Sequence, residues 1–158
     1  MKIKDCMTTK AVTLKRATPL SKVMEIFRDT NFHLLPVVED GNVLAGVVTF
    51  EDILKVFQPY SSDLAQLLKA NPFLEISDQE ELLEADLSPE LGILIVVDDL
   101  MAKEFLVISP DENITKAYTE MKLHNTGILL VTEGGRLSGI ITLFDIILAL
   151  FKEKGVII

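Results

Sequence analysis

The sequence is poor in the residues that build metal sites and disulfides. It has one cysteine, Cys6, and two histidines, His33 and His124. A single thiol excludes an internal disulfide and a cysteine metal cluster. Two histidines are too few for a zinc site without several carboxylates. We therefore expect no metal site, and the simplest role for Cys6 is that of a small packed side chain.

Long apolar runs are also missing. The longest such run near the middle of the chain is Ile93–Val97, far short of the roughly 20 residues that span a bilayer. The amino-terminal MKIKDCM lacks the apolar stretch of a secretory signal peptide. Glycine and proline are too few to indicate disorder over most of the chain. The sequence therefore predicts a folded cytoplasmic protein with no membrane partner.

Positive charge is in the minority. Fifteen Lys and Arg residues face 24 Asp and Glu residues, for a formal net charge of −9. Such a surface repels the nucleic acid backbone, which proteins usually bind through Lys and Arg clusters. We expect no nucleic acid partner. Any anionic ligand has to be held by local geometry, such as helix amino termini and backbone N–H groups.

What the chain does contain is an internal repeat. A shift of 94 residues aligns Asp5 with Asp99 and Asn31 with Asn125. With a one-residue deletion placed near His33, a shift of 93 then aligns the later positions: Val38 with Val131, Gly46 with Gly139, Thr49 with Thr142, and Asp52 with Asp145. Self-similarity over roughly 53 residues in each copy indicates duplicated units that bury each other's faces.

Each copy predicts the element order β-α-β-β-α. The apolar strands are uninterrupted, which predicts sheets covered on both faces, and Asp-Gly and Gly-Gly pairs predict the hairpin turns. The expected strands are 11–14, 34–38 and 43–48 in the first copy, and 105–108, 128–131 and 137–141 in the second. We expect Thr18 to cap the first long helix and Asp111 or Glu112 to cap its counterpart.

A segment of about 40 residues separates the copies. It predicts a helix over Asp63–Ala70, an acid-rich helix after Ser77, and a strand over Leu91–Val97 that leads into the second copy. The acidic run is either a solvated helix face or a docking surface for a partner. The predicted division is residues 1–57, 58–98 and 99–158.

The same strand-to-helix corner closes both copies. Thr49 with Asp52, and Thr142 with Asp145, match a capping box, in which the two side chains satisfy free N–H groups at the helix start. A second interpretation is that hydroxyl, carboxylate and helix start hold a sugar and an attached phosphate. Gly46 and Gly139 lie just before the strand ends and allow another group to approach closely.

These features resemble a CBS-domain pair, also called a Bateman module. The resemblance covers about two-thirds of the chain. It is carried by Asp5-Cys6-Met7-Thr8 and Asp99-Leu100-Met101, by His33-Leu34-Leu35-Pro36-Val37-Val38, and by the corners Gly46-Val47-Val48-Thr49-Phe50-Glu51-Asp52 and Gly139-Ile140-Ile141-Thr142-Leu143-Phe144-Asp145. It implies an α/β (α+β) fold of two pseudo-twofold-related β-α-β-β-α units packed sheet to sheet.

The resemblance also implies two clefts that bind AMP, ADP, ATP or S-adenosylmethionine, with Mg²⁺ accompanying ATP. Asp52 and Asp145 would bind ribose hydroxyls, and Thr49 and Thr142 ribose or phosphate. The implied base pocket of the first copy is formed by Lys10, Ala11, Val12 and Thr13 and closed by His33 and Leu34. That of the second copy is formed by Glu104, Phe105, Leu106 and Val107 and closed by Thr126, Gly127 and Ile128. Many family members place an Arg at the position of Leu34, so the phosphate clamp is weakened here.

Three functions remain to be compared. The leading one is a non-enzymatic module that binds an adenosine compound, forms a homodimer and signals to an effector protein. The alternative is a structural, docking or dimerisation module without a small-molecule ligand. An enzyme is disfavoured because the sequence has no GxGxxG, no phosphate-binding GxxxxGK[ST], and no recognisable Ser-His-Asp set.

Overall fold

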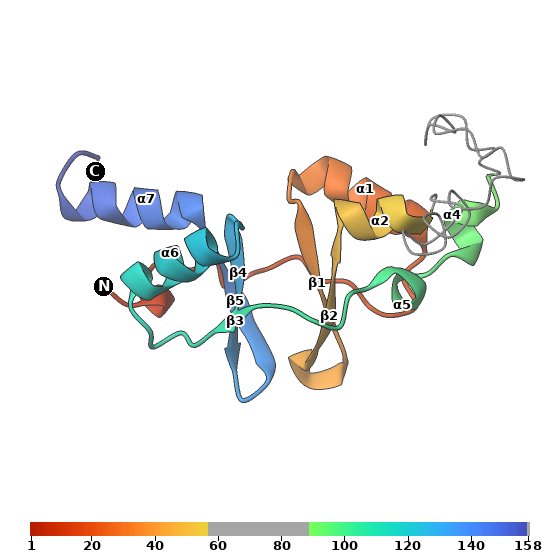
Figure 1. The fold of residues 1–158 in the computed structure, drawn as a ribbon, viewed down its shortest axis with the longest axis horizontal. Coiled ribbons are helices and arrows are strands. Elements are labelled where there is room, and N and C mark those ends of the chain that lie inside the picture. Colours follow the sequence, from red (N-terminus) through yellow and green to blue (C-terminus); the bar gives the residue numbers. More distant parts are fainter. Residues whose placement is uncertain (57–88, 158) are drawn as a thin grey trace, which may run out of the picture.

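The structure is a computed structural model that describes residues 1–56 and 89–157. The first unit consists of α1 (Leu20–Thr30), β1 (Leu34–Val38), β2 (Leu44–Thr49) and α2 (Phe50–Val56). The second unit consists of β3 (Val107–Ile108), α6 (Ile114–Leu123), β4 (Ile128–Glu133), β5 (Arg136–Thr142) and α7 (Leu143–Glu153). Figure 1 shows the two small sheets facing each other, with each pair of helices outside its own sheet.

The predicted fold class is confirmed. An apolar cluster from both sheets joins the units; its buried members are Val38, Val47, Leu130, Leu137 and Ile140. On the outer side of each sheet lies a separate core, filled by the apolar stripe of the long helix. This stripe is Leu20, Val23 and Phe27 in α1, and Ile114, Ala117 and Met121 in α6, the spacing expected for an amphipathic helix. The fold therefore has helices outside and two sheets inside.

The pairing register corrects the alignment of the two copies. Val37 pairs with Gly46 in the first hairpin, and Val131 pairs with Gly139 in the second. Both long helices are followed by an asparagine with positive φ, at Asn31 and at Asn125. The one-residue deletion therefore lies in the hairpin turn and not near His33. As a result, the position equivalent to Phe32 is Thr126, and that of His33 is Gly127.

The first strand of each copy is shorter than predicted. Only Leu14 of the segment 11–14 pairs with β1, while the second copy keeps β3, at Val107–Ile108. Leu14 donates to the carbonyl of Pro36 at 2.8 Å and accepts from Val38 N–H at 3.0 Å. Extending this ladder to Val12 would need an N–H from Pro36, which proline lacks. The structural equivalent of Pro36 is Leu130, which has one.

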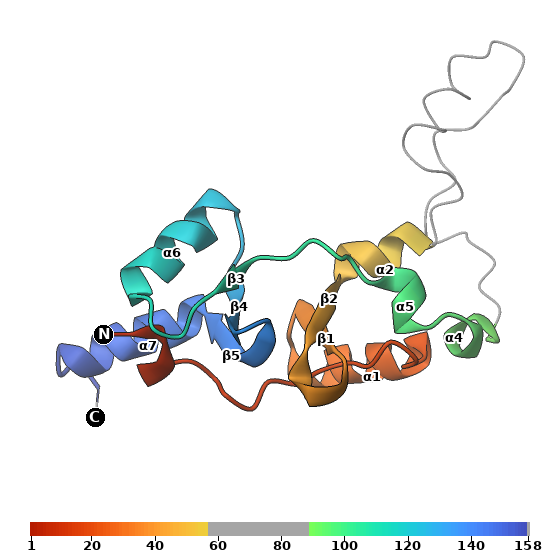
Figure 2. The same cartoon turned by 90° about the horizontal axis from the view of Figure 1, so that it is seen from below.

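The segments that lead into the units are exchanged. The 3₁₀ helix η1 (Ile3–Asp5) packs in the core of the second unit, and α5 (Val97–Leu100) packs in the core of the first. Figure 2 shows this directly, because the red amino-terminal segment lies beside α6 and α7, and α5 lies beside α1 and α2. Chain order and packing therefore differ, and the division at 1–57, 58–98 and 99–158 stays a prediction.

The two close-packed glycines are explained by this exchange. A Cβ on Gly46 would lie 2.7 Å from the carbonyl oxygen of Ala102, and a Cβ on Gly139 would lie 2.5 Å from that of Thr8. The backbone of Ala102 exchanges two hydrogen bonds with Val47, at 2.8 and 3.0 Å, and Thr8 does the same with Ile140, at 2.9 and 3.0 Å. The group that approaches each glycine is thus the incoming backbone of an exchanged segment.

The strand expected over Leu91–Val97 is wrong. The chain forms two short helices there, α4 (Leu91–Leu94) and α5. Asp99 Oδ2 accepts the N–H of Val96 at 3.1 Å, and this bond fixes the start of α5. Asp5 Oδ2 accepts the N–H of Lys2 at 2.9 Å in the same way at η1. The helices expected over Asp63–Ala70 and after Ser77 lie outside the described residues.

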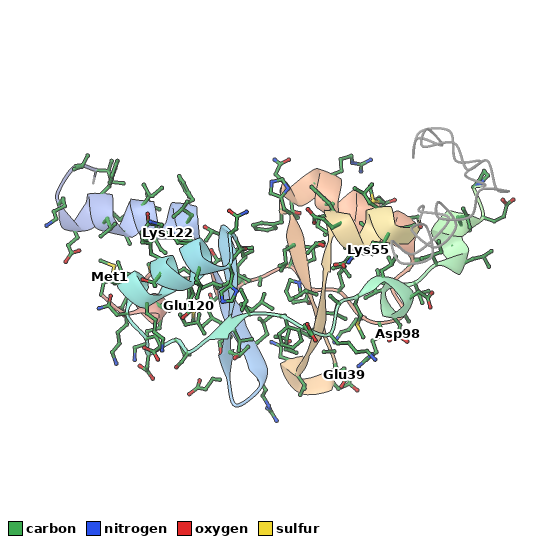
Figure 3. All side chains as sticks on the ribbon, in the orientation of Figure 1. Met1, Glu39, Lys55, Asp98, Glu120 and Lys122 are labelled. Carbon is green, nitrogen blue, oxygen red and sulfur yellow. The ribbon has the colours of Figure 1, made fainter. Side chains whose placement is uncertain are left out.

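Arg16 also holds α5 in place. Its guanidinium lies 2.7 Å from Glu39 Oε1 and 2.7 Å from Asp98 Oδ1; Figure 3 labels Glu39 and Asp98 on this side of the molecule.

In the described part of the chain, no helix has both the length and the apolar character needed to cross a membrane.

Candidate functional site

Each strand-to-helix corner forms a complete capping box. Asp52 Oδ2 accepts the N–H and the hydroxyl of Thr49, at 2.9 and 2.8 Å, while Thr49 Oγ1 accepts the N–H of Asp52 at 3.3 Å. In the second unit, Asp145 and Thr142 make the same three bonds at 2.8, 2.8 and 3.1 Å. The cap is therefore a real role of both pairs, and it uses one carboxylate oxygen in each.

The other oxygen of Asp52, Oδ1, accepts no hydrogen bond from the other described residues. Among the described residues, one cation lies near this oxygen, Lys55 Nζ at 3.6 Å. The Lys55 side chain is 70% exposed, and Asp52 is 8% exposed; Figure 3 labels Lys55 on α2. A nearly buried carboxylate with an accepting oxygen in place suits recognition of hydroxyl groups.

A cleft of about 290 Å³ joins the first corner to the second unit. The first unit contributes its strand-to-helix corner. The second unit contributes the beginning of β4 and the residues just before β3. The exchanged segment that leads into the second unit contributes Ala102. The lining residues are Leu34, Val47, Thr49, Asp52, Ala102, Glu104, Phe105, Leu106, Thr126, Ile128 and Leu130. Residues far apart in the sequence thus meet in one groove between the units.

The family of the protein follows from this arrangement and from direct comparison. The family model for the CBS domain matches residues 3–59 and 97–152. The chain belongs to the CBS-domain family. Both matched segments include the strand-to-helix corners, so this CBS pair carries both copies of the motif that the sequence indicated.

Two relatives extend the comparison. The protein MJ1426 of Methanocaldococcus jannaschii is 31% identical over 157 residues, which cover 95% of this CBS pair and 91% of the relative. A 33.4 kDa protein in a ribosomal RNA operon of Thermofilum pendens is 28% identical over 156 residues, covering 99% of this chain. The chain spans 46% of the length of that second protein.

Solved structures show the same fold. CBSX2 in complex with AMP has a TM-score of 0.69 at 24% identity, covering 97% of this chain and 98% of the other. The CBS pair of MJ0100, in complex with 5′-methylthioadenosine and S-adenosylmethionine, has a TM-score of 0.63 at 21% identity, covering 98% of each chain. At these identities the likeness concerns the fold.

The cleft brings together part of the expected site of the CBS pair. Of the residues named from the sequence, eight lie in it: Leu34, Thr49, Asp52, Glu104, Phe105, Leu106, Thr126 and Ile128. The others do not line this cleft: Lys10, Ala11, Val12, Thr13, His33, Val107, Gly127, Thr142 and Asp145. His33 packs edge-on against Phe50, with ring centroids 5.1 Å apart. Their predicted ligand roles stay predictions.

Three apolar positions of the cleft were not expected from the sequence, namely Val47, Ala102 and Leu130. They are inner-face residues of the two sheets and of the exchanged segment, so their placement depends on how the units meet. For Ala102 the sequence did hold one indication. Gly46 has no side chain, and this leaves room for the backbone of Ala102.

The corner of the second CBS unit has different surroundings. Asp145 lines a separate cavity of about 260 Å³ with Asp5, Cys6, Met7 and the carboxyl-terminal half of α7. Burial raises the pKa of the Cys6 thiol, and the charges of Asp145 and Asp5 raise it further. A thiol with a raised pKa is a poor nucleophile and a poor metal ligand, which agrees with a packing role for Cys6.

The second side of the interface between the CBS units also differs at Phe32. This residue is half-buried and packs against the cluster that joins the two sheets. Its equivalent, Thr126, lines the 290 Å³ cleft. A phenylalanine therefore stands where a pseudo-twofold copy of this cleft would have a threonine, so the two sides of the interface are not equivalent.

Proposed function

We propose that this CBS pair is a non-enzymatic regulatory module that binds an adenosine-containing ligand in the cleft at Thr49 and Asp52. The observation that carries the proposal is that one cleft contains the corner of the first unit together with Phe105 and Thr126 of the second. A ligand in this cleft touches both units. Its site is therefore sensitive to how the units are arranged.

The lining suits a nucleoside. Asp52 Oδ1 offers an acceptor for ribose hydroxyls. Phe105 and the neighbouring aliphatic side chains, Leu34, Leu106 and Ile128, offer apolar surface to a base. Support also comes from relatives of the same fold, since CBSX2 was solved with AMP, and MJ0100 with 5′-methylthioadenosine and S-adenosylmethionine.

The signal would arise from differential affinity. A ligand that contacts both units favours the relative arrangement that fits it best, and it shifts the population by its difference in affinity for the two states. An effector protein, a homodimeric assembly and a cytoplasmic location are further parts of this proposal. Mg²⁺ belongs to it only if the ligand is ATP.

A structural or docking module is the second candidate. It is favoured by the capping boxes, because Thr49 and Asp52 have a complete role without any ligand. In that case the corner side chains serve folding alone, and no adenosine compound changes the stability of the protein.

The two candidates are separated by substituting the equivalent aspartates. Asp52→Ala and Asp145→Ala each remove one cap, and we expect each to lower the free energy of unfolding by about 0.5–2 kcal/mol. Only Asp52 lies in the cleft, so only Asp52→Ala should weaken ligand binding, by about tenfold or more, because a buried acceptor for the ribose is lost. Calorimetry with adenosine, AMP, ADP, ATP and S-adenosylmethionine measures this.

Asp145→Ala is the matched control, since it changes the same residue type at the same position of the other corner. If none of these compounds binds the wild-type protein or raises its melting temperature, the ligand-binding function is ruled out and the docking function is favoured.

A further inference from the structure

The hydroxyl groups in the cleft have already donated their hydrogen bonds. Thr49 Oγ1 donates to Asp52 Oδ2 at 2.8 Å. Thr126 Oγ1 donates to the carbonyl of Ile128 at 3.1 Å and accepts the N–H of Ile128 at 3.3 Å. Each hydroxyl has a single proton to donate. The side chains therefore present acceptors to a ligand, and a phosphate, which at neutral pH mainly accepts, finds no free hydroxyl donor there.

The charges in the cleft are of one sign. Its lining includes the acidic residues Asp52 and Glu104, and none of the described lining residues is Lys, Arg or His. The nearby Lys55 ammonium pairs with Asp52 and so offsets that carboxylate. Glu104 is exposed and has no ion-pair partner among the described residues. The net charge of −9 adds repulsion at longer range.

We propose that the cleft selects adenosine compounds without a phosphate group, with a neutral or positively charged substituent at the 5′ position, and that Glu104 is the residue that sets this selectivity. The inference rests on the proposed function, since it concerns the ligand of the same cleft. Donor groups such as ribose hydroxyls, an adenine amino group or a cation match the acceptors of the cleft, and a phosphate does not.

The experiment compares adenosine with AMP, which differ only in the phosphate. We expect wild-type protein to bind adenosine about tenfold more tightly than AMP in low salt, because the acidic lining of the cleft repels the doubly charged phosphate of AMP. The ratio should shrink at about 0.5 M NaCl, where screening acts over a few ångströms. Isothermal titration calorimetry measures these affinities. A third probe, 5′-methylthioadenosine, should bind with an affinity near that of adenosine.

Two variants test the role of Glu104. In Glu104→Lys the ratio of the affinity for AMP to the affinity for adenosine should rise by about tenfold or more. Glu104→Gln should lie between wild type and Glu104→Lys. Glu133→Lys is the matched control: it changes the net charge by the same amount at the end of β4 opposite Ile128, and it should leave the ratio of the two affinities unchanged.

The outcomes distinguish this inference from the proposed function. AMP binding as tightly as adenosine, or an unchanged ratio in folded Glu104→Lys, overturns the inference and leaves adenosine binding in place. Absence of binding by adenosine and 5′-methylthioadenosine overturns the inference, and absence of binding by AMP, ADP, ATP and S-adenosylmethionine as well overturns both. A preference for adenosine that Glu104→Lys abolishes and Glu133→Lys keeps supports the inference.

Discussion

At the scale of single residues, one pair of side chains both caps a helix and lines the cleft. Thr49 and Asp52 complete a cap through one carboxylate oxygen, and the other oxygen remains near the cleft. Thr142 and Asp145 make the same cap away from this cleft. Local sequence can thus predict the cap in both units, but whether a ligand reaches a corner depends on what the other unit places opposite it.

The closely packed glycines give a prediction at this scale. Gly46→Ala should lower the free energy of unfolding by roughly 1–3 kcal/mol, because its Cβ would lie 2.7 Å from a backbone oxygen that cannot move without shifting the exchanged segment. Urea unfolding at constant temperature measures the loss.

Gly127→Ala is the control for this change, since a Cβ at Gly127 has no atom within 4 Å. It should alter stability by less than about 1 kcal/mol. Equal losses for the two substitutions would contradict the close approach of Ala102 to Gly46.

At the scale of elements, the sequence predicted the existence of helices and strands better than their ends. The apolar spacing located the long helices, but neither begins at the expected cap. Pro19 precedes α1 without a side-chain bond, and Asn113 caps α6 by accepting the N–H of Thr115 at 2.9 Å. The Thr18 hydroxyl instead accepts the N–H of Lys15 at 3.2 Å. Several polar residues compete near a helix start, and tertiary contacts decide which one is used.

The exchange of lead-in segments could not be predicted from local pattern. Ile3 and Val97 occupy equivalent positions before the two copies, and both are fully buried. Ile3 packs against the core of the second unit and Val97 against that of the first. Apolar spacing shows that such residues are buried, but it carries no information on which of two similar cores receives them.

This exchange of segments predicts which unit a core substitution will destabilise. Ile3→Ala should lower the free energy of unfolding by about 2–5 kcal/mol, since it leaves a cavity in a close-packed core. In this variant, hydrogen exchange of the backbone amides should accelerate in β4, β5 and α7 of the second unit, although Ile3 stands at the start of the chain. Hydrogen exchange followed by mass spectrometry measures both units at once.

Val97→Ala is the matched variant and should accelerate exchange in β1, β2 and α1. A pattern in which Ile3→Ala loosens the first unit more than the second would show that the exchanged packing does not occur in solution.

At the scale of the whole molecule, duplication makes the fold more predictable than the site. Two similar amphipathic units that each leave one face of a sheet uncovered can bury both faces against each other, and the cluster of Val38, Val47 and Leu130 does this. The outward faces of the helices are then left for another partner. In the second unit, α6 and α7 form an apolar groove of about 420 Å³, lined by Ile114, Thr115, Tyr118, Leu143, Ile146, Ile147 and Leu150.

The homodimer of the proposed function should use this groove. Ile147 is 41% exposed, Leu150 39% and Phe144 67%, along one helix of a chain with high net charge. Neighbouring apolar side chains on a helix seldom stay in water, and a second copy of the chain offers a surface of the same kind. Light scattering should therefore give a mass near twice the 17.6 kDa of one chain.

Leu150→Glu should shift this mass to that of a single chain, because dimerisation would bury an unpaired carboxylate. The control is Ile93→Glu, which places the same charge at a residue that is 73% exposed on α4, away from the groove. Both variants should keep the helical circular dichroism of the wild type. A wild-type mass of 17.6 kDa at about 100 μM protein, well above the dissociation constant of a stable dimer, would show that the groove is not a dimer interface.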